Sequence, residues 1–238
     1  MTRTTPKWYF WKGVRDGLPF ILVAGPFGLL FGVLATEAGF KLVETMTFSV
    51  SVFAGAAQFT ALQLMQEAAP TIIVIISALA VNLRVAMYSA SLTPYLGAAP
   101  LWQRAVAAYF IVDQSYALSM TRFETDPDMT TPQRMAYFFG TNGLIAPLWY
   151  MATLTGALVG SQIPDAWALD FALPVAFLAM IAPMLRTLPH VIAALTASLV
   201  ALAAAGMAFN LGLIVAGFSG MVAGAQAELF LTRRKIQP

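Results

Sequence analysis

The stretch PTIIVIISALAVNLRVAMYSASLTPYL, residues Pro70–Leu96, decides the fold class of this chain. As a helix it is long enough to cross the roughly 30 Å hydrocarbon core of a bilayer. It nevertheless carries Asn82 and Arg84 well inside. An arginine at mid-membrane costs about 2.5–3.5 kcal/mol on insertion scales. The stretch therefore predicts a membrane-spanning helix whose arginine has a charged partner, a water-filled cavity or a ligand.

The composition of the whole chain supports the same class. Hydrophobic residues make up 59% of the 238 residues and charged residues 10%, against about 25% charged in soluble domains. The mean hydropathy is +0.76. We therefore expect an integral membrane protein that forms a single transmembrane domain over residues 1–238.

Several kinds of chemistry are excluded or disfavoured by the residues present. The chain has no cysteine and one histidine, which excludes a disulfide and a multi-histidine metal or haem site. It contains no G-x-x-x-x-G-K-[ST] or G-x-S-x-G motif. We expect no enzymatic activity, no cofactor, no metal and no nucleic-acid partner.

Apolar segments of about 20 residues predict an all-α polytopic protein with about eight transmembrane helices, some broken or kinked. Seven is the alternative, because the sixth and seventh segments are short. The segments run over 18–36, 46–65, 71–93, 102–121, 134–158, 169–185, 189–206 and 210–231.

The positive-inside rule indicates that both termini are cytoplasmic. With eight spans, all Lys and Arg residues fall on the cytoplasmic side except Lys41, Arg104 and the intramembrane Arg84. The basic, aromatic residues 1–17 are predicted to lie at the cytoplasmic membrane surface. The polar residues 122–133 are predicted to form a central cytoplasmic loop. Similar spacings in the two halves, such as Pro26 and Pro147, hint at an internal repeat, with coincidence as the alternative.

Proline and glycine place a predicted distortion in the first span. Pro26 lies between Gly25 and Gly28, and proline removes a backbone donor and clashes with the preceding turn. We predict that the helix kinks or breaks between Gly25 and Gly28, as broken helices do at transporter binding sites. A simple kink is the alternative. A second such stretch runs from Thr141 through Asn142 to Pro147.

The polar residues of the second, third and fourth spans are predicted to reach similar depths near the midplane. They are Gln58, Asn82, Arg84 and Asp113. The depths of Arg84 and Asp113 differ by only roughly 5 Å at 1.5 Å per residue, so we expect the two side chains to approach one another. Asp113 is either a proton carrier or half of a permanent ion pair. For Gln58 the alternative to ligand contact is an interhelical hydrogen bond.

Gly217, Gly220 and Gly224 of the last span form a face of small residues that permits close helix approach. This face is expected to pack either within the chain or against a partner subunit.

Four stretches carry a resemblance to a known family: PFGLLFGVLA (26–35), FSVSVFAGAAQFTAL (48–62), NLRVAMYSASLTP (82–94) and VDQSYAL (112–118). LGLIVAGFSGMVAG (211–224) is a looser match. The chain resembles the AzlC-type branched-chain amino acid exporters, the large subunits of two-component bacterial permeases. The family pattern usually has an acidic residue after the aspartate, where this chain has Gln114.

The resemblance implies a multi-pass protein of the bacterial inner membrane that exports branched-chain or similar small hydrophobic amino acids. It also implies a small AzlD-type membrane subunit and energy from the proton motive force. The candidate substrate-binding residues are Pro26, Gly28, Phe53, Gln58, Asn82, Arg84 and Asn142, with Phe27, Phe31 and Phe59 as further pocket walls, and Asp113 with Arg84 is the candidate coupling pair. A channel or passive facilitator for small solutes is the alternative function.

Overall fold

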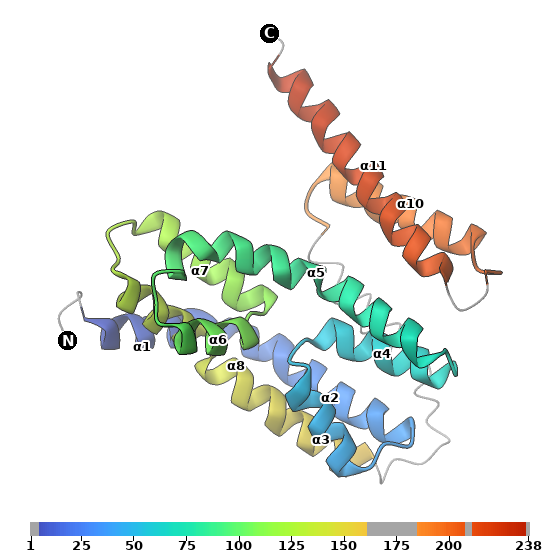
Figure 1. Cartoon of the computed structure of the whole chain (residues 1–238), viewed down its shortest axis with the longest axis horizontal. Coiled ribbons are helices and arrows are strands. Elements are labelled where there is room, and N and C mark those ends of the chain that lie inside the picture. Colours follow the sequence, from blue (N-terminus) through green and yellow to red (C-terminus); the bar gives the residue numbers. More distant parts are fainter. Residues whose placement is uncertain (1–4, 161–184, 208–210, 237–238) are drawn as a thin grey trace. The chain divides into compact units, whose positions relative to one another are not determined.

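The computed structural model describes residues 5–160, 185–207 and 211–236. The chain divides into two compact units, which are described separately: unit 1 holds residues 1–63 and 78–169, and unit 2 holds residues 64–77 and 170–238. The described residues form helices and no strands, which confirms the all-α fold class (Figure 1). The predicted sixth span lies outside the described residues up to residue 184.

Three helices of the described chain are long and apolar enough to cross a membrane: Pro6–Glu37, Thr71–Leu96 and Thr131–Gly160. The first consists of α1 (Pro6–Gly17), one turn of 3-10 helix (Leu18–Phe20) and α2 (Ile21–Glu37). The other two are α5 (Thr71–Leu96) and α8 (Thr131–Gly160). Leu22, Leu79, Leu83, Met87 and Met151 are exposed on their surfaces, as side chains that face lipid must be.

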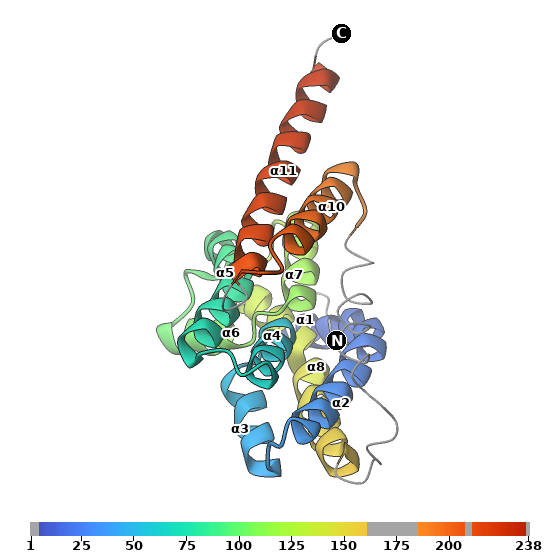
Figure 2. The same ribbon diagram turned by 90° about the vertical axis from the view of Figure 1, so that its right-hand side faces the viewer.

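The helices α1 and α2 run parallel to α8, side by side in both views (Figures 1 and 2). Glycines on both sides bring the two backbones into contact. The pairs, in order along the helices, are Gly13 with Tyr137, Gly17 with Thr141, Gly28 with Trp149, Gly32 with Thr153 and Val33 with Gly160. Because both residue numbers rise together, the two helices point in the same direction. We call the end of unit 1 that holds the first turns of α8 the Arg134 end, and the opposite end the Gly160 end.

The predicted break between Gly25 and Gly28 is wrong. Helix α2 continues through Pro26, and the irregular turn comes earlier, at Leu18–Phe20. A proline removes one hydrogen bond from a helix. Here a Cβ at Gly28 would lie only 3.0 Å from the carbonyl oxygen of Trp149, so close contact with α8 supports the helix beside the proline. Helix α8 likewise continues through Pro147.

The breaks lie instead in the second and fourth predicted spans. The second consists of α3 (Leu42–Ser51) and α4 (Gly55–Gln66), and the fourth of α6 (Leu101–Tyr109) and α7 (Asp113–Thr125). At about 1.5 Å per residue, each of these helices is shorter than the roughly 30 Å hydrocarbon core. Neither segment contains a proline at its break, so the proline signal pointed to the wrong helices.

Helices α6 and α7 form a hairpin with both outer ends at the Arg134 end. Trp102 and Gln103, at the start of α6, line a cavity together with Thr131 and Pro132. At the other end of the hairpin, Asp126 follows α7 and its Oδ2 accepts a hydrogen bond of 2.8 Å from the Tyr9 hydroxyl of α1. The fourth predicted span therefore folds back within unit 1 and does not cross it.

Helices α3 and α4 also fold back on one another. The Gln58 side-chain amide donates to the backbone carbonyls of Val52, at 2.6 Å, and of Ser49, at 3.4 Å. In a continuous helix, residues nine apart are separated by about 13 Å along the axis. The bond to Ser49 therefore requires a sharp turn between the two helices, at Val52–Ala54.

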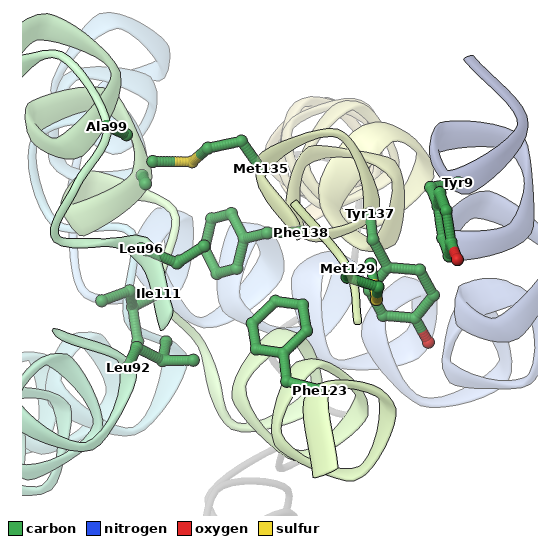
Figure 3. Packing of buried hydrophobic residues seen from close by; sticks show 11 residues of the cluster. Tyr9, Leu92, Leu96, Ala99, Ile111, Phe123, Met129, Met135, Tyr137 and Phe138 are labelled. Carbon is green, nitrogen blue, oxygen red and sulfur yellow. The ribbon is translucent and has the colours of Figure 1, made fainter. Parts of the chain in front are cut away.

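A hydrophobic core at the Arg134 end joins the hairpin α6–α7 to the long helices. Figure 3 shows Met135 and Phe138 of α8 pointing toward Leu96 and Ile111, with Phe123 of α7 below them. The α5 end also reaches α8 through the Arg134 guanidinium, which lies 5.3 Å from the Tyr95 ring centroid. Helix α5 therefore ends where α8 begins.

Unit 2 contains α10 (Leu188–Ala203) and α11 (Leu211–Ile236), packed antiparallel. A Cβ at Gly220 would lie 2.8 Å from the Ala193 carbonyl oxygen, and one at Gly224 would lie 2.9 Å from the Ala193 Cβ. These two glycines therefore pack within the chain, whereas a Cβ at Gly217 would meet no atom within 4 Å.

Candidate functional site

The two helix breaks meet inside unit 1. The Tyr109 hydroxyl, at the end of α6, donates a 2.6 Å hydrogen bond to the Val50 carbonyl at the end of α3. Phe53, in the first break, lies 5.6 Å from Phe110, in the second, between ring centroids. Tyr150 of α8 completes the contact, with its hydroxyl 2.7 Å from that of Tyr109. We call this region, residues 50–54 and 109–113, the break junction.

The first break is held by buried polar groups. The Trp149 indole N–H donates a 3.1 Å hydrogen bond to the Ser49 hydroxyl, which lies 3.4 Å from the Thr153 hydroxyl. Ser49, Gln58 and Thr153 are fully buried. A broken helix leaves carbonyls without intrahelical partners, and in a membrane the protein itself must supply the donors. Gln58 and Tyr109 donate to such carbonyls here, and Trp149 fixes the Ser49 side chain beside them.

Replacing Gln58 by leucine is expected to destabilise the first break. The change removes both donors to Val52 and Ser49, and a buried carbonyl left without a donor costs about 1–3 kcal/mol. The thermal midpoint of the purified protein in mild detergent measures the loss. Gln66→Leu, about two turns further along α4 at an exposed position, is the matched control. An equal midpoint for the two variants would contradict the role given to Gln58.

The second break presents the N-terminus of α7 with a carboxylate in its first turn. Asp113 is the first residue of α7, where the helix dipole favours a negative charge. Ser115 closes the turn, because its hydroxyl accepts a 3.0 Å hydrogen bond from the Val112 N–H and lies 3.2 Å from the Phe110 carbonyl. The carboxylate is thus fixed at the edge of the break junction.

Arg84 of α5 pairs with this carboxylate. Arg84 Nη2 lies 3.2 Å from Asp113 Oδ2, so the approach predicted from their depths is confirmed. The Tyr88 hydroxyl donates a 2.8 Å hydrogen bond to Asp113 Oδ1, and the Tyr88 ring stacks on Tyr116 at 4.1 Å between centroids. The two charged side chains remain 24% and 38% exposed.

Two unpaired polar atoms lie on α5 at the ion pair. Among the described residues, the buried side-chain atoms without a hydrogen-bond partner include Arg84 Nε and Asn82 Oδ1 on α5, and also Gln58 Oε1 in α4 and Asn142 Oδ1 in α8. A buried polar atom without a partner carries a free-energy cost of about 1–3 kcal/mol. One donor and one acceptor of α5 are therefore available to a polar ligand.

The structure separates the predicted site residues into two groups. Phe53, Gln58, Arg84 and Asp113 lie at or beside the break junction, and Asn82 lies on α5 two residues from Arg84. Three others lie elsewhere. Pro26 is exposed, Gly28 packs against α8, and Asn142 is buried in α8 with its side-chain N–H donating to the Phe138 carbonyl. Of the predicted pocket walls, Phe27 and Phe31 pack against Phe59.

Sequence reasoning missed Tyr109 and Trp149 as parts of this region. Tyr88 is one of the polar residues of the third span, and its place four residues after Arg84 puts both on one helix face. Tyr109 and Trp149 act across helices that are far apart in sequence, so local spacing gives no signal for them.

Both helix breaks and the ion pair lie in a region that this chain shares with known proteins. The family model described as "AzlC protein" matches residues 19–163, which include both breaks and the Arg84–Asp113 pair. The chain belongs to the AzlC family. As an AzlC protein it is a multi-pass membrane protein, and its family supports a role in membrane transport.

Two relatives illustrate how far this AzlC chain has diverged from curated proteins. It is 30% identical over 198 residues to an uncharacterized membrane protein of Archaeoglobus fulgidus, covering 82% of this chain and 84% of the relative. It is 25% identical over 178 residues to inner membrane protein YgaZ of Escherichia coli, covering 72% and 71%. No solved structure matches the AzlC chain.

Proposed function

We propose that this protein exports branched-chain or similar small hydrophobic amino acids across the bacterial inner membrane, driven by the proton motive force. The observation that carries the proposal is the Arg84–Asp113 pair beside two broken helices. An amino acid is a zwitterion, so it needs one cation and one anion in the membrane interior. The pair offers both, and broken helices near the bilayer midplane form the substrate sites of many transporters.

The substrate would bind by exchanging partners with the ion pair. Its carboxylate would contact Arg84, whose Nε has no partner, and its ammonium would contact Asp113 and the free Asn82 oxygen. Every charge then stays paired, which matters because an unpaired charge in a low-dielectric site costs several kcal/mol. The side chain would rest against the apolar groups near the junction, such as Phe53 and Phe110.

Coupling would use the same carboxylate. When the substrate leaves to the outer side, Asp113 would accept a proton there, and it would release that proton to the cytoplasm when it pairs with the ammonium of the next substrate. Tyr88 keeps the carboxyl group oriented in both states, because its hydroxyl donates to Oδ1. The protein would act as a transporter and not as an enzyme, together with a small AzlD-type membrane subunit.

Counterflow in proteoliposomes tests the proposal. The chain is reconstituted with and without its AzlD-type subunit, loaded with L-leucine, and exposed to labelled L-leucine or, as a control, labelled L-glutamate. With the complex, internal L-leucine is expected to accelerate uptake of labelled L-leucine at least ~10-fold, and L-glutamate is expected to stay near background. A tenfold difference in rate corresponds to a difference of about 1.4 kcal/mol in activation free energy.

Three outcomes would contradict parts of the proposal. Flux without acceleration by internal substrate would indicate a passive channel. Full activity of the chain alone would contradict the proposal that an AzlD-type subunit is needed. Absence of flux for L-leucine, L-valine, L-isoleucine and L-methionine by the complex would remove the substrate assignment.

A further inference from the structure

A second cavity of unit 1 lies beside the hairpin α6–α7. It has a volume of about 350 Å³ and lies between α5, α6 and the first turns of α8. Ligand sites commonly occupy roughly 300–1,000 Å³. Its walls are mainly apolar, with two hydroxyl groups and one guanidinium, and include Ser89, Thr93, Leu96, Arg104, Ala108 and Ile111.

The inner end of this cavity is lined by residues that are close in sequence to the candidate site, although the ion pair itself is not part of the lining. Ser89 directly follows Tyr88, which holds Asp113, and Ile111 lies in the second break two residues before Asp113. The outer end is formed by Gly97, Leu101 and Arg104, which lie between α5 and α6 at the Arg134 end. The cavity therefore runs from the Arg134 end toward the ion pair.

The hairpin arrangement places Arg104 on the opposite side of the membrane from that predicted for eight crossing spans. If the fourth span crossed the membrane, Arg104 and Arg134 would lie on opposite faces. In the structure the start of α6 and the start of α8 line one cavity, so both residues belong to the Arg134 end. Among the described Lys and Arg residues of unit 1, this leaves Lys41 alone at the Gly160 end, beside Glu37 and Glu44.

This distribution of charge identifies the cytoplasmic face. Lys7, Lys12 and Arg15 of α1 lie at the Arg134 end with Arg122, whose guanidinium lies 5.6 Å from the Tyr9 ring. Cytoplasmic segments near membrane spans carry an excess of Lys and Arg. With Arg104 moved to the Arg134 end, the asymmetry is sharper than it is for eight crossing spans.

We propose that α6–α7 is a re-entrant hairpin that enters from the cytoplasmic face, and that the cavity beside it is the vestibule through which a small hydrophobic amino acid reaches the Arg84–Asp113 pair. The substrate assignment rests on the proposed export function, whereas the sidedness does not. Arg104 attracts the substrate carboxylate at the outer end, and the apolar walls accept its side chain. The vestibule gives an exporter access to its substrate from inside the cell.

The absence of cysteine from the chain makes a direct test practical. Single variants Gln103→Cys, Asp128→Cys and Lys41→Cys are treated with a membrane-impermeant maleimide in right-side-out and inverted vesicles. Gln103→Cys and Asp128→Cys are expected to react from the same face, and Lys41→Cys from the other. Reaction of Gln103→Cys from the Lys41→Cys face would overturn the re-entrant hairpin.

The vestibule is tested by the rate of the same reaction deeper in the hairpin. Ala108→Cys, in the cavity wall, is expected to react from the cytoplasmic face, and millimolar L-leucine is expected to slow that reaction at least ~3-fold, or about 0.7 kcal/mol. Val106→Cys is the matched control, because Val106 is exposed on α6 outside the cavity lining. Equal rates and equal L-leucine effects for the two variants would overturn the vestibule.

This design tests the sidedness of the hairpin and the substrate assignment independently, so one proposal can be contradicted while the other is supported. Labelling from the cytoplasmic face without protection by any hydrophobic amino acid would support the re-entrant hairpin and contradict the substrate assignment. Counterflow of L-leucine together with labelling of Gln103→Cys from the outer face would support the export function and contradict the re-entrant hairpin.

Discussion

Asp113→Asn is expected to lower the thermal midpoint of the protein and to abolish driven export, while Arg84→Gln/Asp113→Asn together restores the midpoint without restoring export. The single change leaves the Arg84 guanidinium without its carboxylate, and loss of a hydrogen bond to a charged group costs about 1.5–3 kcal/mol. Neutralising both residues removes the unpaired charge. Melting in mild detergent and efflux of labelled L-leucine measure the two effects. Asp128→Asn, in an exposed loop, is the control.

The same variant decides between the two roles left open for Asp113. If Asp113 carries the proton, Asp113→Asn loses driven export but keeps counterflow at a raised KM for L-leucine, because exchange needs no net proton movement and the asparagine oxygen can still accept from the substrate ammonium. If Asp113 is a permanent partner of Arg84, both activities are lost together. An unchanged midpoint with full export would contradict any role for the pair.

Gly156→Ala and Gly32→Ala are expected to destabilise the protein strongly, although alanine favours helices more than glycine. A Cβ at Gly156 would overlap the Leu29 carbonyl oxygen, and one at Gly32 would overlap that of Thr153. The backbones would have to separate, and overpacking of this kind typically costs about 1–3 kcal/mol. For a chain of this size we expect the thermal midpoint to fall by about 2–4 °C per kcal/mol.

Gly25→Ala is the matched control on the same helix. A Cβ there would meet the Leu148 side chain at 3.7 Å, an ordinary contact, so the helix gains about 0.5–1 kcal/mol from the lost flexibility of glycine. Midpoints that fall equally for Gly25→Ala and Gly156→Ala would show that α2 and α8 are not in backbone contact.

The sequence predicted the membrane class and the main polar pair for physical reasons that do not depend on tertiary contacts. Long apolar runs require burial in lipid, and Arg84 and Asp113 could be placed at similar depth by counting residues from the ends of their spans. Their 3.2 Å contact agrees with the cost of leaving either charge alone, although the count of depths assumed a continuous fourth span, which the structure does not have.

The breaks could not be predicted in the same way. Pro26 and Pro147 are the local signals of a broken helix, yet α2 and α8 continue through them because they support one another along their length. The real breaks, at Val52–Ala54 and Phe110–Val112, are made by contacts between distant segments, such as Tyr109 with Val50 and Gln58 with Ser49. Each hairpin consists of two short apolar helices joined by a short turn. A count of consecutive apolar residues therefore predicts one membrane-crossing helix in place of the two.

The glycine contacts between α2 and α8 have a mechanical consequence. No layer of side chains separates Gly32 from Thr153 or Gly156 from Leu29, so these helices have nothing that can repack to let one slide along the other. We therefore expect these two helices to move as one rigid pair. If the protein exports its substrate as proposed, alternating exposure of the ion pair would come from movement of the short helices at the two breaks. The Tyr109–Val50 hydrogen bond joins the two breaks, so it would have to open during that movement.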